Sequence, residues 1–118
     1  MRVLLADQRP DVRLALALLL NREPGVSIVG SASETEGLLA LARSARPDIV
    51  VLDRDLPGSR TEDVLSSLRI LDQHLKILLL NASSSPATRA QLTNTDAIVS
   101  KNDSPEILLE KFRALFIT

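Results

Sequence analysis

Five short apolar runs alternate along the chain with longer segments that carry a helical pattern. The apolar runs are Val3–Ala6, Val26–Gly30, Ile49–Asp53, Ile77–Leu80 and Ala97–Ser100. The central run is apolar at four successive positions before its terminal aspartate, which is typical of a strand buried on both faces of a parallel sheet. Strands that alternate with helices predict an α/β fold with right-handed crossovers and a parallel sheet.

Each interval between these runs contains a helix signal. The predicted helices are Asp11 to Arg22, Ser33 to about Ala45, Ser59 to near Leu71, Pro86 to Leu92, and a last helix from Pro105. Ser33-Glu34-Thr35-Glu36 has the pattern of a capping box, and the Ser59–Glu62 segment is expected to open its helix in the same way. Ser85 and Ser104 each place a capping hydroxyl before a proline at the first helical position.

Composition narrows the class of protein. A length of 118 residues predicts one domain, residues 1–118, and a net charge of −1 from 14 basic and 15 acidic residues argues against direct binding to nucleic acid or an anionic membrane. The chain has no cysteine, which excludes disulfides and thiolate metal sites. The apolar segment Leu14 to Leu20 is too short to cross a bilayer. We therefore expect a soluble, cytoplasmic domain.

Polar residues stand at the ends of four of the five predicted strands. They are Asp7, Asp53, Asn81 and Lys101. The carboxyl ends of parallel strands meet at one edge of such a sheet, where ligands and chemistry are found, so these side chains are expected to converge. A carboxylate that attacks a phosphoryl group needs a divalent cation and a cationic side chain to offset the negative charges. Asp53 suits the nucleophile, Asp7 the cation ligand and Lys101 the cationic side chain.

Three longer segments carry a family resemblance: RVLLADQRPDVRLALALLLNREPGVSIVGSA, RPDIVVLDRDLPG and SKNDSPEILLEKFRAL. With them the whole chain resembles the receiver domains of two-component response regulators, most closely those of the LuxR type. The resemblance implies a doubly wound, flavodoxin-like fold of five parallel strands in the order 2-1-3-4-5. It also implies that Asp53 is the phosphoacceptor, that Asp7 and Asp53 bind Mg²⁺ together with the backbone carbonyl of Asp55, and that Lys101 is the lysine of the fifth strand.

Three positions depart from the pattern of this family. Gln8 stands where a second acid is the usual metal ligand, so Mg²⁺ is expected to bind weakly because one ligand charge is missing. Asn81 replaces the hydroxyl residue that bonds the phosphoryl group, and Ile98 replaces the aromatic residue that reports phosphorylation. Asn81 and Ile98 are therefore the candidate switch residues, and the usual switch is expected to be absent.

The function implied by the resemblance is reception of a phosphoryl group from a sensor histidine kinase and control of an output, expected to be transcriptional. DNA would be bound only by a helix-turn-helix domain outside this chain, and the sole chemistry would be self-phosphorylation. The face of the fourth helix, fifth strand and fifth helix is expected to receive partners, including a second copy of the chain. An alternative is a degenerate receiver that acts as a phosphorylation-independent interaction module. A flavin- or nucleotide-binding enzyme is disfavoured because no glycine-rich loop follows the first strand.

Overall fold

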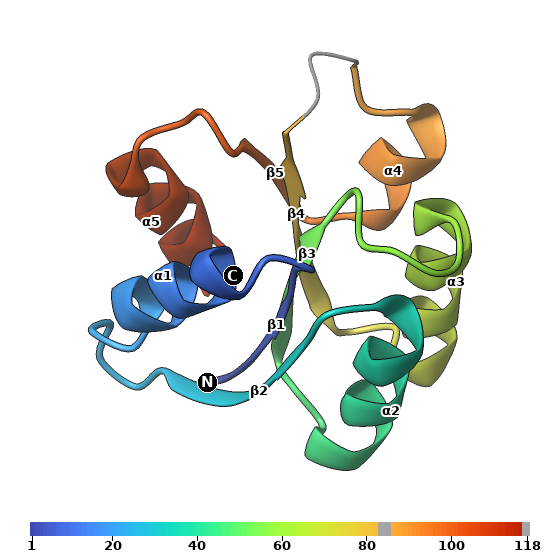
Figure 1. Ribbon diagram of the computed structural model, residues 1–118, viewed down its shortest axis with the longest axis horizontal. Coiled ribbons are helices and arrows are strands. Elements are labelled where there is room, and N and C mark those ends of the chain that lie inside the picture. Colours follow the sequence, from blue (N-terminus) through green and yellow to red (C-terminus); the bar gives the residue numbers. More distant parts are fainter. Residues whose placement is uncertain (83–85, 117–118) are drawn as a thin grey trace.

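Five parallel strands form one sheet in the order β2-β1-β3-β4-β5 (Figure 1). The computed structural model describes residues 1–82 and 86–116. The strands are β1 (Arg2–Ala6), β2 (Ser27–Ala32), β3 (Ile49–Asp53), β4 (Lys76–Asn81) and β5 (Ala97–Ser100). The helices are α1 (Pro10–Leu20), α2 (Thr35–Ala45), α3 (Thr61–Leu71), α4 (Arg89–Asn94) and α5 (Pro105–Ala114). The predicted fold and strand order are confirmed.

The helices cover both faces of the sheet. Helices α1 and α5 lie on one face and α2, α3 and α4 on the other (Figure 1). Alternate residues of each strand point to opposite faces, so neighbours in β3 enter different cores: Val50 packs with the α2–α3 side and Val51 with the α1–α5 side. Every residue of β3 is buried, which is the physical reason for its uninterrupted apolar sequence.

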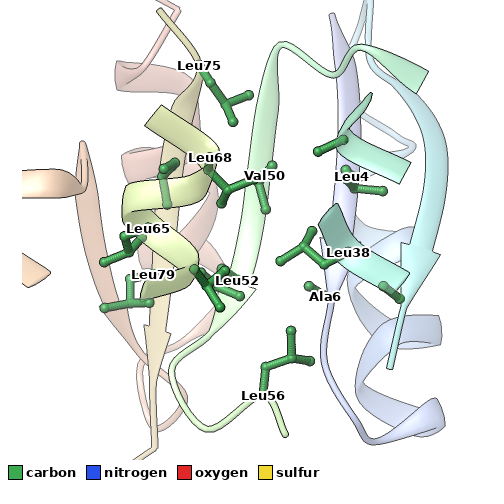
Figure 2. Packing of buried hydrophobic residues seen from close by; sticks show 14 residues of the cluster. Leu4, Ala6, Leu38, Val50, Leu52, Leu56, Leu65, Leu68, Leu75 and Leu79 are labelled. Carbon is green, nitrogen blue, oxygen red and sulfur yellow. The ribbon is translucent and has the colours of Figure 1, made fainter. Parts of the chain in front are cut away.

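Leucine dominates the core between the sheet and the α2–α3 layer (Figure 2). Leu4 and Leu79 come from the sheet, Leu38 from α2, and Leu65 and Leu68 from α3, and all five are fully buried. Aliphatic side chains fill this layer without aromatic residues, because the only two in the chain, Phe112 and Phe116, belong to the opposite core. Among the described residues, no helix is long and apolar enough to cross a membrane.

For two helices, the predicted capping residue is wrong. Helix α2 is capped by the carboxylate of Glu34, which accepts from the backbone N–H groups of Glu36 and Gly37, and not by Ser33. Helix α3 begins after Arg60 with no side-chain cap bond, so a cap at Ser59 is not formed. In both cases a neighbouring residue occupies the cap position, and the sequence pattern does not distinguish positions one residue apart.

The predicted start of the fourth helix is also wrong. Helix α4 begins at Arg89 because Thr88 and Gln91 form a reciprocal capping box there. The predicted cap at Ser85 lies outside the described residues. The cap of α5 is confirmed, since the Ser104 side chain accepts from the N–H of Ile107.

Phe112 is the largest fully buried side chain of the α1–α5 core, and its ring meets Phe116 edge to face with centroids 4.7 Å apart. We expect Phe112→Ala to lower the free energy of unfolding by about 3–5 kcal/mol, because the substitution leaves a cavity. Urea denaturation measures this change. The control is Ile70→Ala on α3, where the isoleucine is 86% exposed and the expected change is within about 0.5 kcal/mol. Equal losses in the two variants would contradict this packing.

Candidate functional site

Lys101 joins two buried aspartates at the carboxyl edge of the sheet. Its Nζ lies 2.6 Å from Oδ2 of Asp7 and 3.3 Å from Oδ2 of Asp53. Asp7 follows β1, Asp53 ends β3 and Lys101 follows β5, so the lysine side chain crosses the end of β4 to reach both acids. The side chains of Asp7 and Asp53 are 0% and 3% exposed, and that of Lys101 is 20% exposed. The predicted convergence of these three residues is confirmed.

Backbone N–H groups hold the other carboxylate oxygens. Oδ1 of Asp7 accepts from the N–H of Arg9 at 2.9 Å, and Oδ1 of Asp53 accepts from the N–H of Asp55 at 3.1 Å. Each bond spans two residues and is the local turn that aspartate favours after a strand. The two carboxylates are therefore fixed by the backbone on one side and by Lys101 on the other.

Burial and charge shift the pKa values of two groups in this site. Burial is the main cause that raises the pKa of Asp53, and the negative charge of Asp7 adds to it, while the bond from Asp55 N–H and the charge of Lys101 act in the opposite direction. For Lys101, burial alone lowers the pKa, but the hydrogen bond to Asp7 and the charges of both aspartates raise it overall. The ammonium is thus held in its charged form beside an acid whose ionisation is disfavoured.

Contacts with the start of α2 hold the loop after Asp53. The backbone N–H of Thr35 donates to the carbonyl of Pro57 at 2.9 Å, and the N–H of Ser59 donates to Oγ1 of Thr35 at 2.9 Å. Gly58 between them has φ +117°, and a Cβ there would collide with the Thr35 hydroxyl. The Pro57-Gly58 turn therefore needs glycine for both its backbone conformation and its close approach to α2.

Asn81 is turned toward Arg54, the residue after Asp53. Nη1 of Arg54 donates to Oδ1 of Asn81 at 3.2 Å, and the backbone carbonyl of Asn81 accepts from the N–H of Lys101 at 3.0 Å. Sequence reasoning missed Arg54, because in the sequence only its position directly after Asp53 distinguishes it from the other arginines of the chain. It also missed Arg13, whose guanidinium donates to the backbone carbonyl of Asp7 at 2.7 Å.

The remaining predicted site residues are Gln8, Asp55 and Ile98. Gln8 and Asp55 are exposed, and Asp55 contributes its backbone N–H to Asp53. Ile98 on β5 is half-buried and packs against the leucine-rich core of the α2–α3 side.

The donor set suits a hard divalent cation. The carboxylates of Asp7 and Asp53 face the same ammonium, and each carboxylate has lone pairs beyond those used in its present bonds. Oxygen ligands of this kind are what Mg²⁺ prefers. Within residues 1–82 and 86–116, no group of three or more histidine, cysteine, aspartate or glutamate side chains could hold a metal ion. A cation at this site would therefore depend on two carboxylates and on backbone, amide or water oxygens.

Comparison with known proteins identifies the family. Residues 3–113 match the model of the response regulator receiver domain. The chain belongs to this family. The nitrate/nitrite response regulator protein NarL of Escherichia coli is 30% identical to this receiver domain over 110 residues, which are 92% of this chain and 51% of NarL. NarP from the same organism is 29% identical over 115 residues, or 96% of this chain and 54% of NarP. The receiver domain thus spans about half the length of the curated relatives it matches.

Solved structures show the same architecture. A two-component response regulator of the LuxR family from Aurantimonas sp. SI85-9A1 superposes with a TM-score of 0.88 at 28% identity, covering 97% of this receiver domain and 83% of that chain. The isolated receiver domain of RcsB from Salmonella enterica serovar Typhimurium, solved with the phosphomimetic BeF3-, superposes with a TM-score of 0.91 at 23% identity, covering 98% and 88% of the two chains. The second likeness concerns the fold alone.

The raised pKa of Asp53 predicts how the stability of the receiver domain depends on pH. A carboxyl whose pKa is raised by folding contributes its stability below the ordinary aspartate pKa and loses it as pH rises through the folded value. Ionised Asp53 is therefore a net cost at neutral pH. We expect Asp53→Asn to increase the free energy of unfolding at pH 7, with a gain that shrinks as the pH falls through the raised pKa of Asp53 toward the ordinary aspartate value and then stays constant.

Urea denaturation across this pH range measures the effect. The matched control is Asp55→Asn, which neutralises an exposed carboxylate in the same loop and is expected to change stability by no more than about 0.5 kcal/mol. An Asp53→Asn variant that is less stable than the parent protein at pH 7 would show that the charge of Asp53 is a net benefit.

Proposed function

We propose that this receiver domain accepts a phosphoryl group on Asp53 from the phosphohistidine of a sensor histidine kinase. The observation that carries the proposal is the Lys101 ammonium, which lies within 3.3 Å of both Asp53 and its buried neighbour Asp7. A buried acid, a second acid and a shared cation are the parts that transfer of a phosphoryl group to a carboxylate requires. The chemistry of the domain is then limited to its own phosphorylation.

In the proposed transfer, a carboxylate oxygen of Asp53 attacks the phosphorus atom. A P–O bond forms, the P–N bond of the phosphohistidine breaks, and the imidazole nitrogen keeps the electron pair. The backbone N–H of Asp55 and the ammonium of Lys101 orient the Asp53 carboxylate, and the ammonium offsets negative charge on the phosphoryl oxygens. Asn81 can contribute an amide N–H in place of the hydroxyl group expected in this family.

Mg²⁺ is the cofactor we propose, with Asp7, Asp53, Gln8 and the backbone carbonyl of Asp55 as its ligands. The cation would shield the carboxylates from the incoming phosphoryl anion. Gln8 supplies an amide oxygen without a negative charge, so the affinity is expected to be low.

The proposed output is transcriptional and is exerted through a separate helix-turn-helix domain that binds DNA. Support comes from the length of the relatives, of which this chain spans about half, and from the LuxR family of the Aurantimonas regulator. The face formed by α4, β5 and α5 is the proposed surface for the output partner or for a second copy of the chain. Leu92 of α4 and Ile107 of α5 are exposed apolar residues of these elements.

Incubation with a small-molecule phosphodonor and Mg²⁺ tests the phosphoacceptor. We expect slow, partial phosphorylation by intact-mass spectrometry, because the nucleophile and the lysine are in place while one metal ligand lacks its charge. Asp53→Ala should abolish the modification, and the neighbouring Asp55→Ala should retain it. Rapid, complete modification would contradict the prediction that the site is impaired. No Asp53-dependent modification by this donor or by phosphorylated histidine kinases would favour the phosphorylation-independent interaction module.

The metal site is tested by restoring the missing charge. We expect Gln8→Asp to tighten Mg²⁺ binding, because it adds one negative charge beside the cation in a site where ligand charge sets affinity. Isothermal titration measures the dissociation constant. Gln73→Asp, which adds the same charge at an exposed position between α3 and β4, is the control and should leave the affinity unchanged. Equal or weaker affinity in Gln8→Asp would refute the charge argument.

A further inference from the structure

Arg54 is held rigidly beside the proposed phosphoacceptor. Its backbone N–H donates to the carbonyl of Leu80 at 2.9 Å, and its carbonyl accepts from Oγ1 of Thr61 at 2.5 Å. The first bond joins the residue to β4 and the second to the first residue of α3. The Arg54 side chain therefore starts from a fixed point directly after Asp53.

The guanidinium connects two further segments. Nη1 donates to Oδ1 of Asn81 at 3.2 Å, and Nη2 donates to the backbone carbonyl of Pro86 at 3.4 Å. Both acceptors are neutral, and both distances are at or beyond the long end of the usual range for N–H···O bonds. A guanidinium pairs with a phosphate or carboxylate through two parallel charge-assisted bonds, which a neutral carbonyl oxygen does not offer. These contacts are therefore ones that a nearby anion can outcompete.

The same guanidinium lies close to the contact between α3 and α4. Oε1 of Glu62 in α3 accepts from Oγ1 of Thr88 and from Nε2 of Gln91, both at 3.2 Å. A backbone hydrogen bond at Glu62 itself is the main cause that lowers the pKa of Glu62; burial, the next largest effect, raises it, and the bond from Thr88 and the charges of Arg60 and Arg54 lower it further. The Arg54 guanidinium thus contacts Asn81 at the end of β4 and lies near the group of residues that starts α4.

We propose that Arg54 is the positioning residue that transmits modification of Asp53 to the segment from Pro86 to Asn94. This inference rests on the proposed function. With a phosphoryl group on Asp53, the guanidinium leaves Oδ1 of Asn81 and the carbonyl of Pro86 for the phosphoryl oxygens, and the segment before α4 loses its tether. The two positions of one side chain form the two-state element that the pair Asn81 and Ile98 does not provide.

Beryllofluoride is a stable mimic of the phosphoryl group that binds together with Mg²⁺. It tests this proposal on the parent protein. The ¹⁹F NMR signal reports the bound probe, the Nε–Hε resonance of Arg54 reports its guanidinium, and hydrogen exchange reports residues 86–94. We expect the probe to shift the Arg54 resonance and to speed exchange over residues 86–94 severalfold. In Arg54→Ala, exchange over this segment should be fast already and should change little on binding. The charge-neutral Arg54→Gln should behave in the same way.

The matched control is Arg60→Ala, which removes an equal charge from the same loop. The Arg60 guanidinium lies 3.9 Å from Oε2 of Glu62 and its side chain is 80% exposed, so this variant should respond to the probe as the parent protein does. A bound probe with an unmoved Arg54 resonance, or with an undiminished exchange response in Arg54→Ala, would overturn the role of Arg54 and leave the phosphoacceptor intact. Absence of any Asp53-dependent ¹⁹F signal would overturn the proposed function and this inference together.

Discussion

The ammonium of Lys101, shared between Asp7 and Asp53, is the contact on which the site depends. Two buried carboxylates at one sheet edge repel each other and lose hydration, which is costly unless a cation and hydrogen bonds compensate. Lys101 can compensate both only because β1 and β3 are neighbours and because its side chain reaches across the end of β4. The chemistry of the site therefore depends on the strand order. One negative charge remains uncompensated, and this favours a cation.

Hydrogen bonds from three separate elements surround this charged group. The Pro57-Gly58 turn is fastened to Thr35 at the start of α2, and Arg54 is fastened to β4 and α3 through its backbone. The backbone around Asp53 is therefore rigid, and the side chain of Arg54 is the neighbour that we propose to exchange one set of acceptors for another. A rigid acceptor with one movable neighbour provides the two discrete arrangements that a conformational signal requires.

Elements that depend on periodicity and on strand ends could be predicted from the sequence, and tertiary contacts could not. The apolar run of β3 indicated a strand buried on both faces, and the parallel sheet then brought Asp53 and Lys101 to one edge. The sequence predicts the cap of α2 at Ser33 because serine is a favoured capping residue, whereas the structure uses the neighbouring carboxylate of Glu34. The contacts of Arg54 were not foreseen because they join residues 27 and 32 positions away in the sequence, and no local pattern records them.

The central claim is that Asp53 is a buried acid whose negative charge is stabilised by the ammonium of Lys101. The most direct measurement is a ¹³C NMR titration of the Asp53 side-chain carboxyl carbon in the parent protein and in Lys101→Met. The account predicts a pKa of Asp53 above that of an ordinary aspartate, because burial outweighs its hydrogen bonds and the lysine charge. It predicts a further rise when the ammonium is removed. A pKa of Asp53 at or below the ordinary value, unchanged in Lys101→Met, would contradict it.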